Sequence, residues 1–330
     1  MGGDFAPTAP VHGALLALAE LGSGHRIQLI GREADIVAAL DAATAGELSA
    51  LAAQRARIDI VHAPDIVGMA EKPTAVLRRP QSSMAIGLQR HAAGDADAFL
   101  SAGSTGAQMV GSVKWLGLHA GLERPAIGAI FPTALQTVLV LDGGANVDCS
   151  ADELVHFARL GLVYAEDILG RTNPAVALLS IGEEPEKGNA AVKAAHQLLA
   201  RTDLHFIGNV EGRDVAAGTC DRGPFDVVVC DGFTGNVILK FYEALAPILV
   251  DMIAKSINAD PTTVMKGLAH LDYSNYGGAP LLGVKGVSII AHGKSSPRAI
   301  KNAVNVAVRA AESHMSEHIG RRLAAAASAA

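Results

Sequence analysis

Residues 182–189 contain side chains suited to chemistry on an anionic substrate. The segment reads Gly-Glu-Glu-Pro-Glu-Lys-Gly-Asn, so three carboxylates crowd around Lys187 just before a predicted helix. Lys187 could hold a phosphate there, because the positive end of the helix dipole adds to the charge of the ammonium group. A solvated loop with a weak surface ion pair explains the same residues, and the spacing alone favours that simpler interpretation.

A second segment, Asp-Gly-Phe-Thr-Gly-Asn at 231–236, follows an apolar run. Its two glycines would let the backbone approach a ligand closely, and Asn236 could donate a hydrogen bond to a developing oxyanion. A tight turn with Asn236 as the N-cap of a helix fits equally well. Asn146 and Asn209 follow apolar runs in the same way and have the same two interpretations.

A third segment, His-Gly-Lys-Ser-Ser at 292–296, offers a cation, hydroxyls and backbone N–H groups together. It predicts an anion pocket or an ordinary capped helix, and Pro297 suits the first helical position in both cases. Cys230 ends an apolar run, and a buried small hydrophobe is favoured there over a nucleophile.

The sequence contains six short apolar runs, each of which ends at a turn of small polar residues. The three segments described above are among these turns. The runs are 98–101, 138–141, 176–181, 205–207, 227–230 and 287–291. Runs of Val, Ile, Leu and Ala without alternation are typical of strands covered on both faces. Because open α/β sheets bind ligands at the carboxyl ends of parallel strands, the turns predict one rim lined by backbone N–H groups.

The remaining elements alternate between strand and helix, which is typical of an α/β protein. We expect further strands at 26–30, 58–62 and 126–131, and helices at 7–21, 33–51, 82–94, 105–117, 150–170, 189–201, 240–257 and 297–318. No linker is evident, so the sequence predicts one α/β domain over 1–330, with a helical lobe at 240–276 and a frayed tail at 324–330. The turn-like Met-Gly-Gly-Asp at 1–4 has no strand before it; we expect either a start further upstream or a sheet that lacks a strand.

Composition narrows the function classes. The chain has 330 residues, half of them hydrophobic but only 4% aromatic, and a net charge of −6. The acidic balance argues against nucleic acid as the main ligand. Three cysteines without CxxC spacing indicate a reducing cytosol, and no apolar window is long enough to cross a membrane. No metal-ligand spacing, nucleotide-binding loop or nucleophile elbow appears, so we expect no metal and no cofactor.

One reaction suits these parts: attack by phosphate on an activated acyl group. Phosphate is anionic near neutral pH, as the second pKa of about 6 for phosphoserine illustrates, and a thiol leaving group of pKa about 8.5 needs little protonation. Such a reaction needs an anion cradle, oxyanion donors and positioning, but no enzyme nucleophile.

The chain resembles the bacterial phosphate acyltransferases, the acyl-acyl-carrier-protein:phosphate transacylases. The matching stretches run in family order at 1–4, 82–84, 96–107, 124–126, 142–146, 181–184, 187–189, 208–214, 231–237, 273–283 and 292–293. Each stretch alone is weak, but together they cover nearly the whole chain.

The resemblance implies phosphorolysis of a long-chain acyl thioester on acyl carrier protein by direct phosphate attack. The acyl phosphate would serve phospholipid synthesis, through a downstream glycerol-3-phosphate acyltransferase. The resemblance also implies a doubly wound, largely parallel sheet with helices on both faces, like that of the isocitrate and isopropylmalate dehydrogenases and the phosphotransacetylases. It implies a cytoplasmic homodimer that associates with the membrane surface.

Two departures qualify the resemblance. The family has an apolar strand before the Met-Gly-Gly-Asp turn, and the stretch 240–273 is shorter here, with only Lys255 and Lys266 after Lys240. The alternatives are an acyl-CoA-type phosphotransacylase, a decarboxylating dehydrogenase of the same fold, and a non-catalytic scaffold for acyl carrier protein.

The predicted site combines the polar segments. We predict Lys187, Asn236 and Asp231 as catalytic. Substrate and phosphate contacts are predicted for Gly2, Gly3, Asp4, Ser104, Thr105, Gly106, Asn146, Gly188, Asn189, Asn209, Gly235, His292, Gly293 and Ser295. The apolar face of 240–257 would form an acyl groove, a lipid contact, or core or dimer packing, and Lys294, Arg298 and Lys301 would form a basic patch for the acidic carrier protein.

Overall fold

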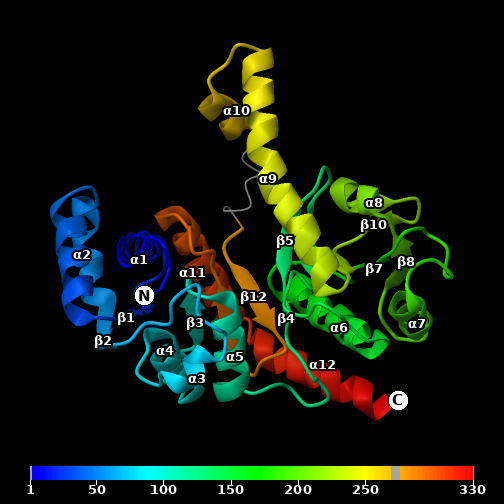
Figure 1. Ribbon diagram of the computed structural model, residues 1–330, viewed down its shortest axis with the longest axis horizontal. Coiled ribbons are helices and arrows are strands. Elements are labelled where there is room, and N and C mark those ends of the chain that lie inside the picture. Colours follow the sequence, from blue (N-terminus) through cyan, green and yellow to red (C-terminus); the bar gives the residue numbers. More distant parts are fainter. Residues whose placement is uncertain (1, 269–275, 330) are drawn as a thin grey trace. The chain divides into compact units, whose positions relative to one another are not determined.

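The computed structural model describes residues 2–268 and 276–329, which form two compact units (Figure 1). Unit 1 comprises Met1–Leu118 and Tyr276–Ser316, and unit 2 comprises His119–Asn275 and Glu317–Ala330. Both units alternate strands and helices, so the predicted α/β class is confirmed. The single domain expected over the whole chain remains a prediction.

Unit 1 has two groups of paired strands. Its strands are β1 (Ile27–Gly31), β2 (Ile58–His62), β3 (Ala98–Ser101), β12 (Ala279–Leu282) and β13 (Val287–Ile290). β1 pairs in parallel with β2, and β3 pairs in parallel with β13, which is antiparallel to β12. The sequence predicted one largely parallel sheet, whereas the described strands of unit 1 are divided between two.

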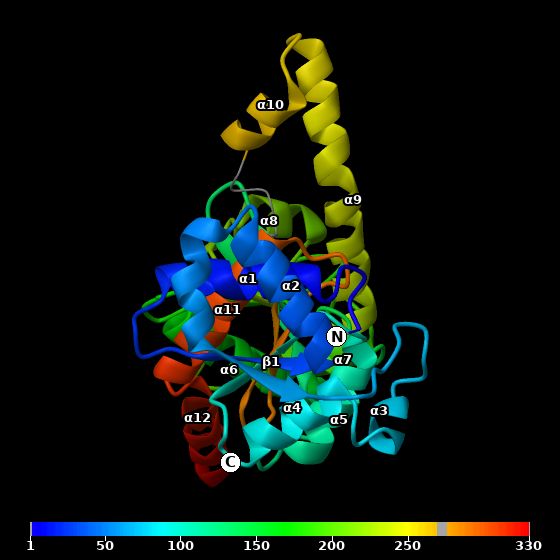
Figure 2. The same ribbon diagram turned by 90° about the vertical axis from the view of Figure 1, so that its left-hand side faces the viewer.

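Helices cover both faces of these strands (Figure 2). They are α1 (Thr8–Glu20), α2 (Glu33–Ala45), the 3-10 helix η1 (Ser49–Arg57), α3 (Ala75–Arg78), α4 (Ser83–Ala92), α5 (Thr105–Trp115) and α11 (Pro297–Glu312). Ser82 caps α4 by accepting a hydrogen bond from the Ala85 N–H. Pro297 occupies the first turn of α11 behind the capping Ser296, as predicted. α1 packs on α11. The two helices are so close at Gly13 that a Cβ added to this residue would lie only 2.5 Å from the side chain of Ile300.

Unit 2 is built on a five-stranded sheet in the order β5-β6-β11-β7-β8. The strands of this sheet are β5 (Ala129–Pro132), β6 (Thr137–Leu141), β7 (Val176–Leu179), β8 (Phe206–Val210) and β11 (Val227–Val229). Outside it lie the short strands β4 (Ala126–Ile127), β9 (Thr219–Cys220) and β10 (Gly223–Pro224). β6, β11, β7 and β8 are parallel. Their carboxyl ends therefore share one edge, which confirms the predicted rim for this unit.

The helices of unit 2 are α6 (Ala151–Asp167), α7 (Ala190–Leu199), α8 (Gly212–Ala217), α9 (Gly232–Ser256) and α10 (Pro261–Gly267). α6 begins with a capping box of Ser150 and Glu153. Val138 and Val140 of β6 pack with Tyr242 of α9, whereas Gly161 of α6 lies against Leu141 and Val227. Since neighbouring strand residues face opposite sides, α6 and α9 cover opposite faces of the sheet.

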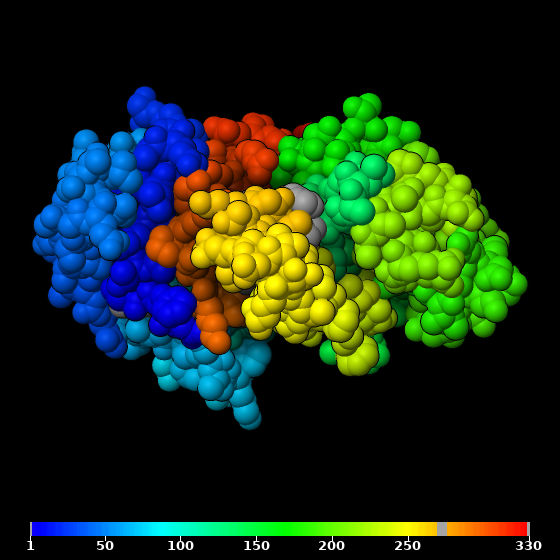
Figure 3. Space-filling model, turned by 90° about the horizontal axis from the view of Figure 1, so that it is seen from above, coloured from blue at the N-terminus to red at the C-terminus, as the bar shows by residue number. Residues whose placement is uncertain are grey.

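α9 and α10 form an apolar hairpin (yellow in Figure 3). Val250 and Ala254 of α9 pack with Val264 of α10. Outside this contact α9 exposes several large hydrophobic side chains: Phe241 (67%), Ile248, Met252 and Ile253. Its C-cap residue Ile257 is exposed as well. The apolar face predicted for 240–257 is therefore not core packing within the described chain.

Several boundary predictions were wrong. The helix expected from residue 240 begins at Gly232, because Asp231 caps it. The strand expected at 205–207 continues to Val210, so Asn209 lies within it. The strand expected at 126–131 is interrupted between β4 and β5. The tail expected to fray is helical to Ala329 in α12 (Met315–Ala329), as its high alanine content allows.

Candidate functional site

Asp142 organises the turn that follows β6. The side chain is fully buried, and its carboxylate accepts hydrogen bonds from the backbone N–H groups of Ile127, Gly144, Ala145 and Asn146 at 2.7–3.1 Å. Burial raises the pKa of Asp142, and these hydrogen bonds counteract the rise. The turn at 142–146 is consequently held in one conformation.

The same contacts occupy Asn146. Its Nδ2 donates to the Pro125 carbonyl at 2.8 Å and to Asp142 Oδ2 at 2.9 Å, and only 5% of the residue is exposed. Both amide hydrogens are thus directed into the protein, so the structure assigns Asn146 to the support of the turn.

The first turn of α9 packs closely on the turn at 142–146. Gly232 N–H donates to the Asn146 carbonyl at 2.7 Å. A Cβ on Gly232 would lie 2.5 Å from that same oxygen, and a Cβ on Gly235 would overlap the Asp142 carbonyl oxygen. The two glycines of the segment 231–236 are therefore explained by this backbone approach.

Asp231 and Asn236 have different roles in this helix. Asp231 is the N-cap: Oδ1 accepts from the Thr234 N–H at 2.8 Å, and Oδ2 accepts from the Thr234 hydroxyl at 3.0 Å. Asn236 lies in the second turn, is exposed, and has its side chain beside Gly144. Within residues 2–268 and 276–329 its amide has no hydrogen-bond partner, so it is available to a substrate. The interpretation of Asn236 as an N-cap is wrong.

Lys187 lies in the loop between β7 and α7. Asn189 caps α7 by accepting from the Val192 N–H at 2.9 Å, and Gly188 has a φ of +102°, a conformation that favours glycine. The Lys187 side chain is exposed, and in the described part of the chain its ammonium group forms no ion pair. The surface ion pair that the simpler interpretation required is absent among these residues.

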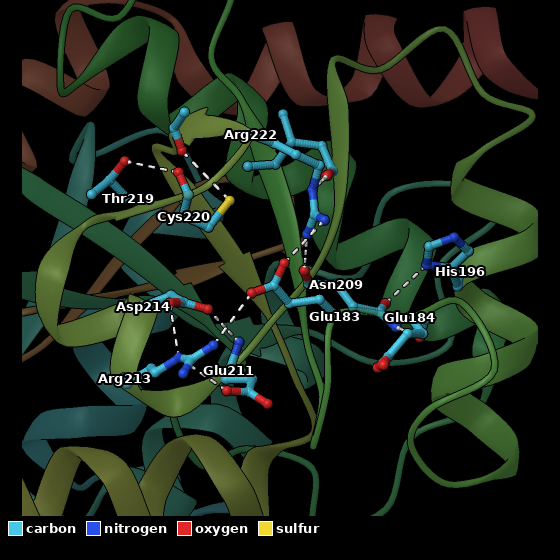
Figure 4. A network of polar contacts seen from close by, with 12 residues as sticks. Glu183, Glu184, His196, Asn209, Glu211, Arg213, Asp214, Thr219, Cys220 and Arg222 are labelled. Carbon is cyan, nitrogen blue, oxygen red and sulfur yellow. Dashed lines mark hydrogen bonds and ion pairs between the residues drawn. The ribbon is translucent and has the colours of Figure 1, made fainter.

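One of the three carboxylates that precede Lys187, that of Glu183, is engaged elsewhere (Figure 4). Glu183 lies 3.4 Å from Arg213 Nη2 and 3.4 Å from Arg222 Nη1. Arg213 also contacts Glu211 and Asp214. The sequence analysis assigned no role to either arginine; the alternating charges in Glu-Gly-Arg-Asp at 211–214 were the available signal.

Asn209 anchors the Lys187 loop to β8. It is fully buried; its Nδ2 donates to the Glu184 carbonyl at 2.8 Å, and its Oδ1 lies 2.9 Å from His196 Nδ1 (Figure 4). Arg222 donates to the Asn209 carbonyl. With both ends of its amide engaged, Asn209 positions the loop, while its predicted phosphate contact remains untested.

Unit 1 brings together its own predicted residues. The Asp4 N–H donates to the Gly293 carbonyl at 2.9 Å. Gly3 lies so close to Ala102 that an added Cβ would be 2.9 Å from the Ala102 carbonyl oxygen. Ser104 caps α5, which begins at Thr105 and Gly106. Gly2 lies against Gly103, and the Ser295 N–H donates to the His292 carbonyl. The turns at 2–4, 102–106 and 292–295 thus form one polar cluster at the carboxyl ends of β3 and β13.

Two of the cysteines are poor nucleophiles. Burial raises the pKa of Cys149 to about 12, and burial also raises that of Cys230 strongly. Cys230 is 3% exposed, which confirms its interpretation as a buried small side chain.

Comparisons with known proteins agree with this architecture. Residues 1–318 match the family model described as "Fatty acid synthesis protein". The phosphate acyltransferase of Desulforamulus reducens is 45% identical over 322 residues, which is 94% of this chain and 92% of the relative. The phosphate acyltransferase of Aquifex aeolicus is 44% identical over 317 residues, or 93% and 90% of the two chains.

Solved structures show the same fold at low sequence identity. A phosphotransacetylase from Streptococcus pyogenes has a TM-score of 0.56 at 14% identity and covers 92% of this chain and 98% of its own. The EutD phosphotransacetylase from Staphylococcus aureus has a TM-score of 0.54 at 14% identity, with coverage of 91% and 99%.

Proposed function

Since this chain belongs to the phosphate acyltransferase family, whose members transfer acyl groups to phosphate, we propose that its acyl donor is long-chain acyl carrier protein. The acyl phosphate formed would be used in phospholipid synthesis. The observation that supports this most is the exposed ammonium group of Lys187 just before α7, which forms no ion pair within the described part of the chain, while two arginines engage Glu183. An unpaired cation beside a helix N-terminus favours an anionic ligand.

In the proposed reaction, a phosphate oxygen attacks the thioester carbonyl carbon and forms the new C–O bond. The carbonyl becomes a tetrahedral oxyanion, which then re-forms the double bond as the C–S bond breaks and the thiolate leaves. Lys187 holds the phosphate, and Asn236 Nδ2 donates to the oxyanion. Because both oxygens of Asp231 bind Thr234, we assign Asp231 to positioning the helix start rather than to proton transfer.

The raised pKa values of Cys149 and Cys230 favour direct attack by phosphate over an acyl-enzyme on either of these two thiols. Gly188 and Asn189, which were also predicted as contacts, would supply backbone N–H groups to the phosphate, and the polar cluster of unit 1 offers N–H groups and hydroxyls of its own. Their roles are part of the proposal.

We also propose a homodimer that works at the cytoplasmic face of the membrane. The exposed apolar side chains of α9 support a lipid contact or a subunit interface. No described helix is long and apolar enough to cross a bilayer. Vesicle flotation tests the lipid contact: absence of the protein from the lipid fraction would contradict it.

For the acidic carrier protein we propose Lys294 and Arg298 as contacts. Lys301 is already engaged with Glu20 at 2.7 Å and is the weakest member of the predicted basic patch. Charge reversal of Lys294 and Arg298 should weaken carrier binding; unchanged affinity would remove this surface from the proposal.

The donor is tested by comparing palmitoyl-acyl carrier protein with palmitoyl-coenzyme A, with the acyl phosphate trapped by hydroxylamine. A preference for the carrier protein in kcat/KM supports the proposal. A preference for the coenzyme A thioester would indicate a phosphotransacylase of that type, and carrier binding without turnover would indicate a scaffold.

A further inference from the structure

Glu183 links the loop at 182–188, which carries Lys187, to two other segments of unit 2 (Figure 4). Its carboxylate lies 3.4 Å from Arg213 Nη2, at the start of α8, and 3.4 Å from Arg222 Nη1, in the turn between β9 and β10. The Glu183 side chain is only 27% exposed, so water screens these ion pairs less than it screens a pair on the open surface. One carboxylate of the loop therefore joins two arginines that follow β8 in the sequence.

Arg222 is itself fixed to the sheet. Its Nε donates to the Ile207 carbonyl at 2.5 Å, and its Nη2 donates to the Asn209 carbonyl. Both carbonyls belong to β8, the last strand in the order β5-β6-β11-β7-β8. The planar guanidinium thus binds the outer edge of the sheet with two donors and keeps Nη1 for Glu183. A contact with Arg222 is consequently a contact with the sheet.

The backbone on either side of Glu183 determines the course of the Lys187 side chain. Gly182 is buried, and a Cβ added to it would lie 2.9 Å from Lys187 Cγ, so the stem of Lys187 runs against this residue. On the other side, the Glu184 carbonyl accepts from the Lys187 N–H at 3.0 Å and from Asn209 Nδ2 at 2.8 Å. A displacement of Glu183 would therefore shift both surfaces on which Lys187 rests.

Such a link affects catalysis more than it affects folding. A partly exposed ion pair contributes little to the free energy of unfolding. In contrast, a displacement of a catalytic group by about 1 Å can lower the rate about 100-fold. The ammonium group of a lysine depends on its surroundings for a fixed position, because its stem is long and flexible. The contribution of Glu183 should therefore appear in the reaction with phosphate.

We propose that Glu183 is a positioning residue: its ion pairs with Arg222 and Arg213 hold the loop at 182–188 so that Lys187 meets phosphate in one preorganised position. This inference rests on the proposed function, in which Lys187 holds the phosphate. Glu183 acts through Lys187 and not on the reacting atoms. Arg222 is the main anchor, because Arg213 is 72% exposed and also contacts two other carboxylates.

The test compares Glu183→Ala with Glu186→Ala. Glu186 lies in the same loop, is exposed, and in the described part of the chain forms no ion pair, so its variant removes the same charge without removing a link. We expect Glu183→Ala to raise KM for phosphate about tenfold and to leave KM for palmitoyl-acyl carrier protein within about twofold. Glu186→Ala should change neither.

Three readouts distinguish positioning from a defect in folding. A folding defect reduces the amount of active enzyme and so the apparent kcat, but it leaves KM for phosphate unchanged. Glu183→Gln keeps a hydrogen-bond acceptor of the same length and should recover part of the loss. The Lys187 N–H donates to the Glu184 carbonyl, and its exchange with solvent should become faster in Glu183→Ala, whereas exchange in β6 should not change.

A combined variant tests whether Glu183 acts through Lys187. Glu183→Ala together with Lys187→Ala should have the kcat/KM for phosphate of Lys187→Ala alone, within about twofold, because no ammonium group is then left to position. Losses that multiply, an unchanged KM for phosphate in Glu183→Ala, or an equal rise in Glu186→Ala would overturn the positioning role and leave the proposed function standing. Activity of Lys187→Ala equal to that of the parent would instead refute the role of Lys187, and the positioning role with it.

Discussion

Replacement of Lys187 by alanine should separate catalysis from folding. The ammonium group is exposed and forms no ion pair in the described chain, so its loss should change the free energy of unfolding by about 0.5 kcal/mol or less. If the group holds the phosphate during attack, its loss should lower kcat/KM for phosphate about 100- to 1000-fold. That factor corresponds to about 2.7–4 kcal/mol of transition-state stabilisation, the range seen when one preorganised electrostatic group is removed.

The assay is hydroxylamine-trapped acyl phosphate formation, with phosphate as the varied substrate. Lys193→Ala is the matched control, because Lys193 is also exposed and lies on the adjoining helix α7. It should leave kcat/KM within about twofold, in line with an ordinary surface substitution. Lys187→Arg should recover part of the activity, since the charge is kept but its shape differs.

Two results would refute this reasoning. Turnover of Lys187→Ala within about threefold of the parent would exclude a role in transition-state stabilisation. An equal loss in Lys193→Ala would show that the overall positive charge matters, not the position beside the start of α7.

Three further predictions follow. Gly235→Ala should lower the free energy of unfolding by about 1–3 kcal/mol, because the added Cβ would overlap a buried carbonyl oxygen. Gly267→Ala is the control and should not lower it, because nothing lies within 4 Å of the added Cβ. Equal thermal midpoints for the two variants would contradict this prediction. Cys149→Ala should keep phosphate-dependent turnover within about twofold, because a thiol of pKa about 12 is not a nucleophile near neutral pH; loss of activity with an intact fold would restore the acyl-enzyme route. The Lys301 ion pair lowers the pKa of Glu20, so its contribution exists above the unfolded value of 4.5 and disappears as the pH falls through the lowered folded value. The free energies of unfolding of Glu20→Gln and the parent, measured by urea titration, should then differ by a few tenths of a kcal/mol near pH 7 and converge at low pH, as for an exposed ion pair. A difference that stays constant with pH would contradict this.

Much of the architecture could be predicted from the sequence, because it depends on local signals. Uninterrupted apolar runs ending in small polar turns gave the strands β6, β7 and β11 and their common edge. The capping of α4 and α6 by Ser82 and Ser150 likewise depends only on neighbours within one helical turn.

The errors arose where distant contacts decide the outcome. Asn209 resembles a turn residue in sequence, but the bonds it makes to Glu184 and His196 keep it inside β8. Asn146 could not be distinguished from a free donor until Asp142 and Pro125 were seen to occupy its amide. In both cases the partner is a backbone or side-chain group that only the folded chain brings near.

Asp231 illustrates the same limit for the start of α9. The next four residues include two glycines, and glycine is unfavourable in helix interiors. The helix forms there because those glycines allow it to pack on the turn at 142–146, and a tertiary contact outweighs the local preference.

The most direct test of the central claim, direct attack by phosphate, is a burst experiment. Enzyme is mixed with a modest excess of palmitoyl-acyl carrier protein in phosphate-free buffer, thiol release is followed, and phosphate is then added. The account predicts no release before phosphate, then release matched by trapped acyl phosphate. A burst of thiol stoichiometric with enzyme in the absence of phosphate would reveal a covalent acyl-enzyme and contradict the account.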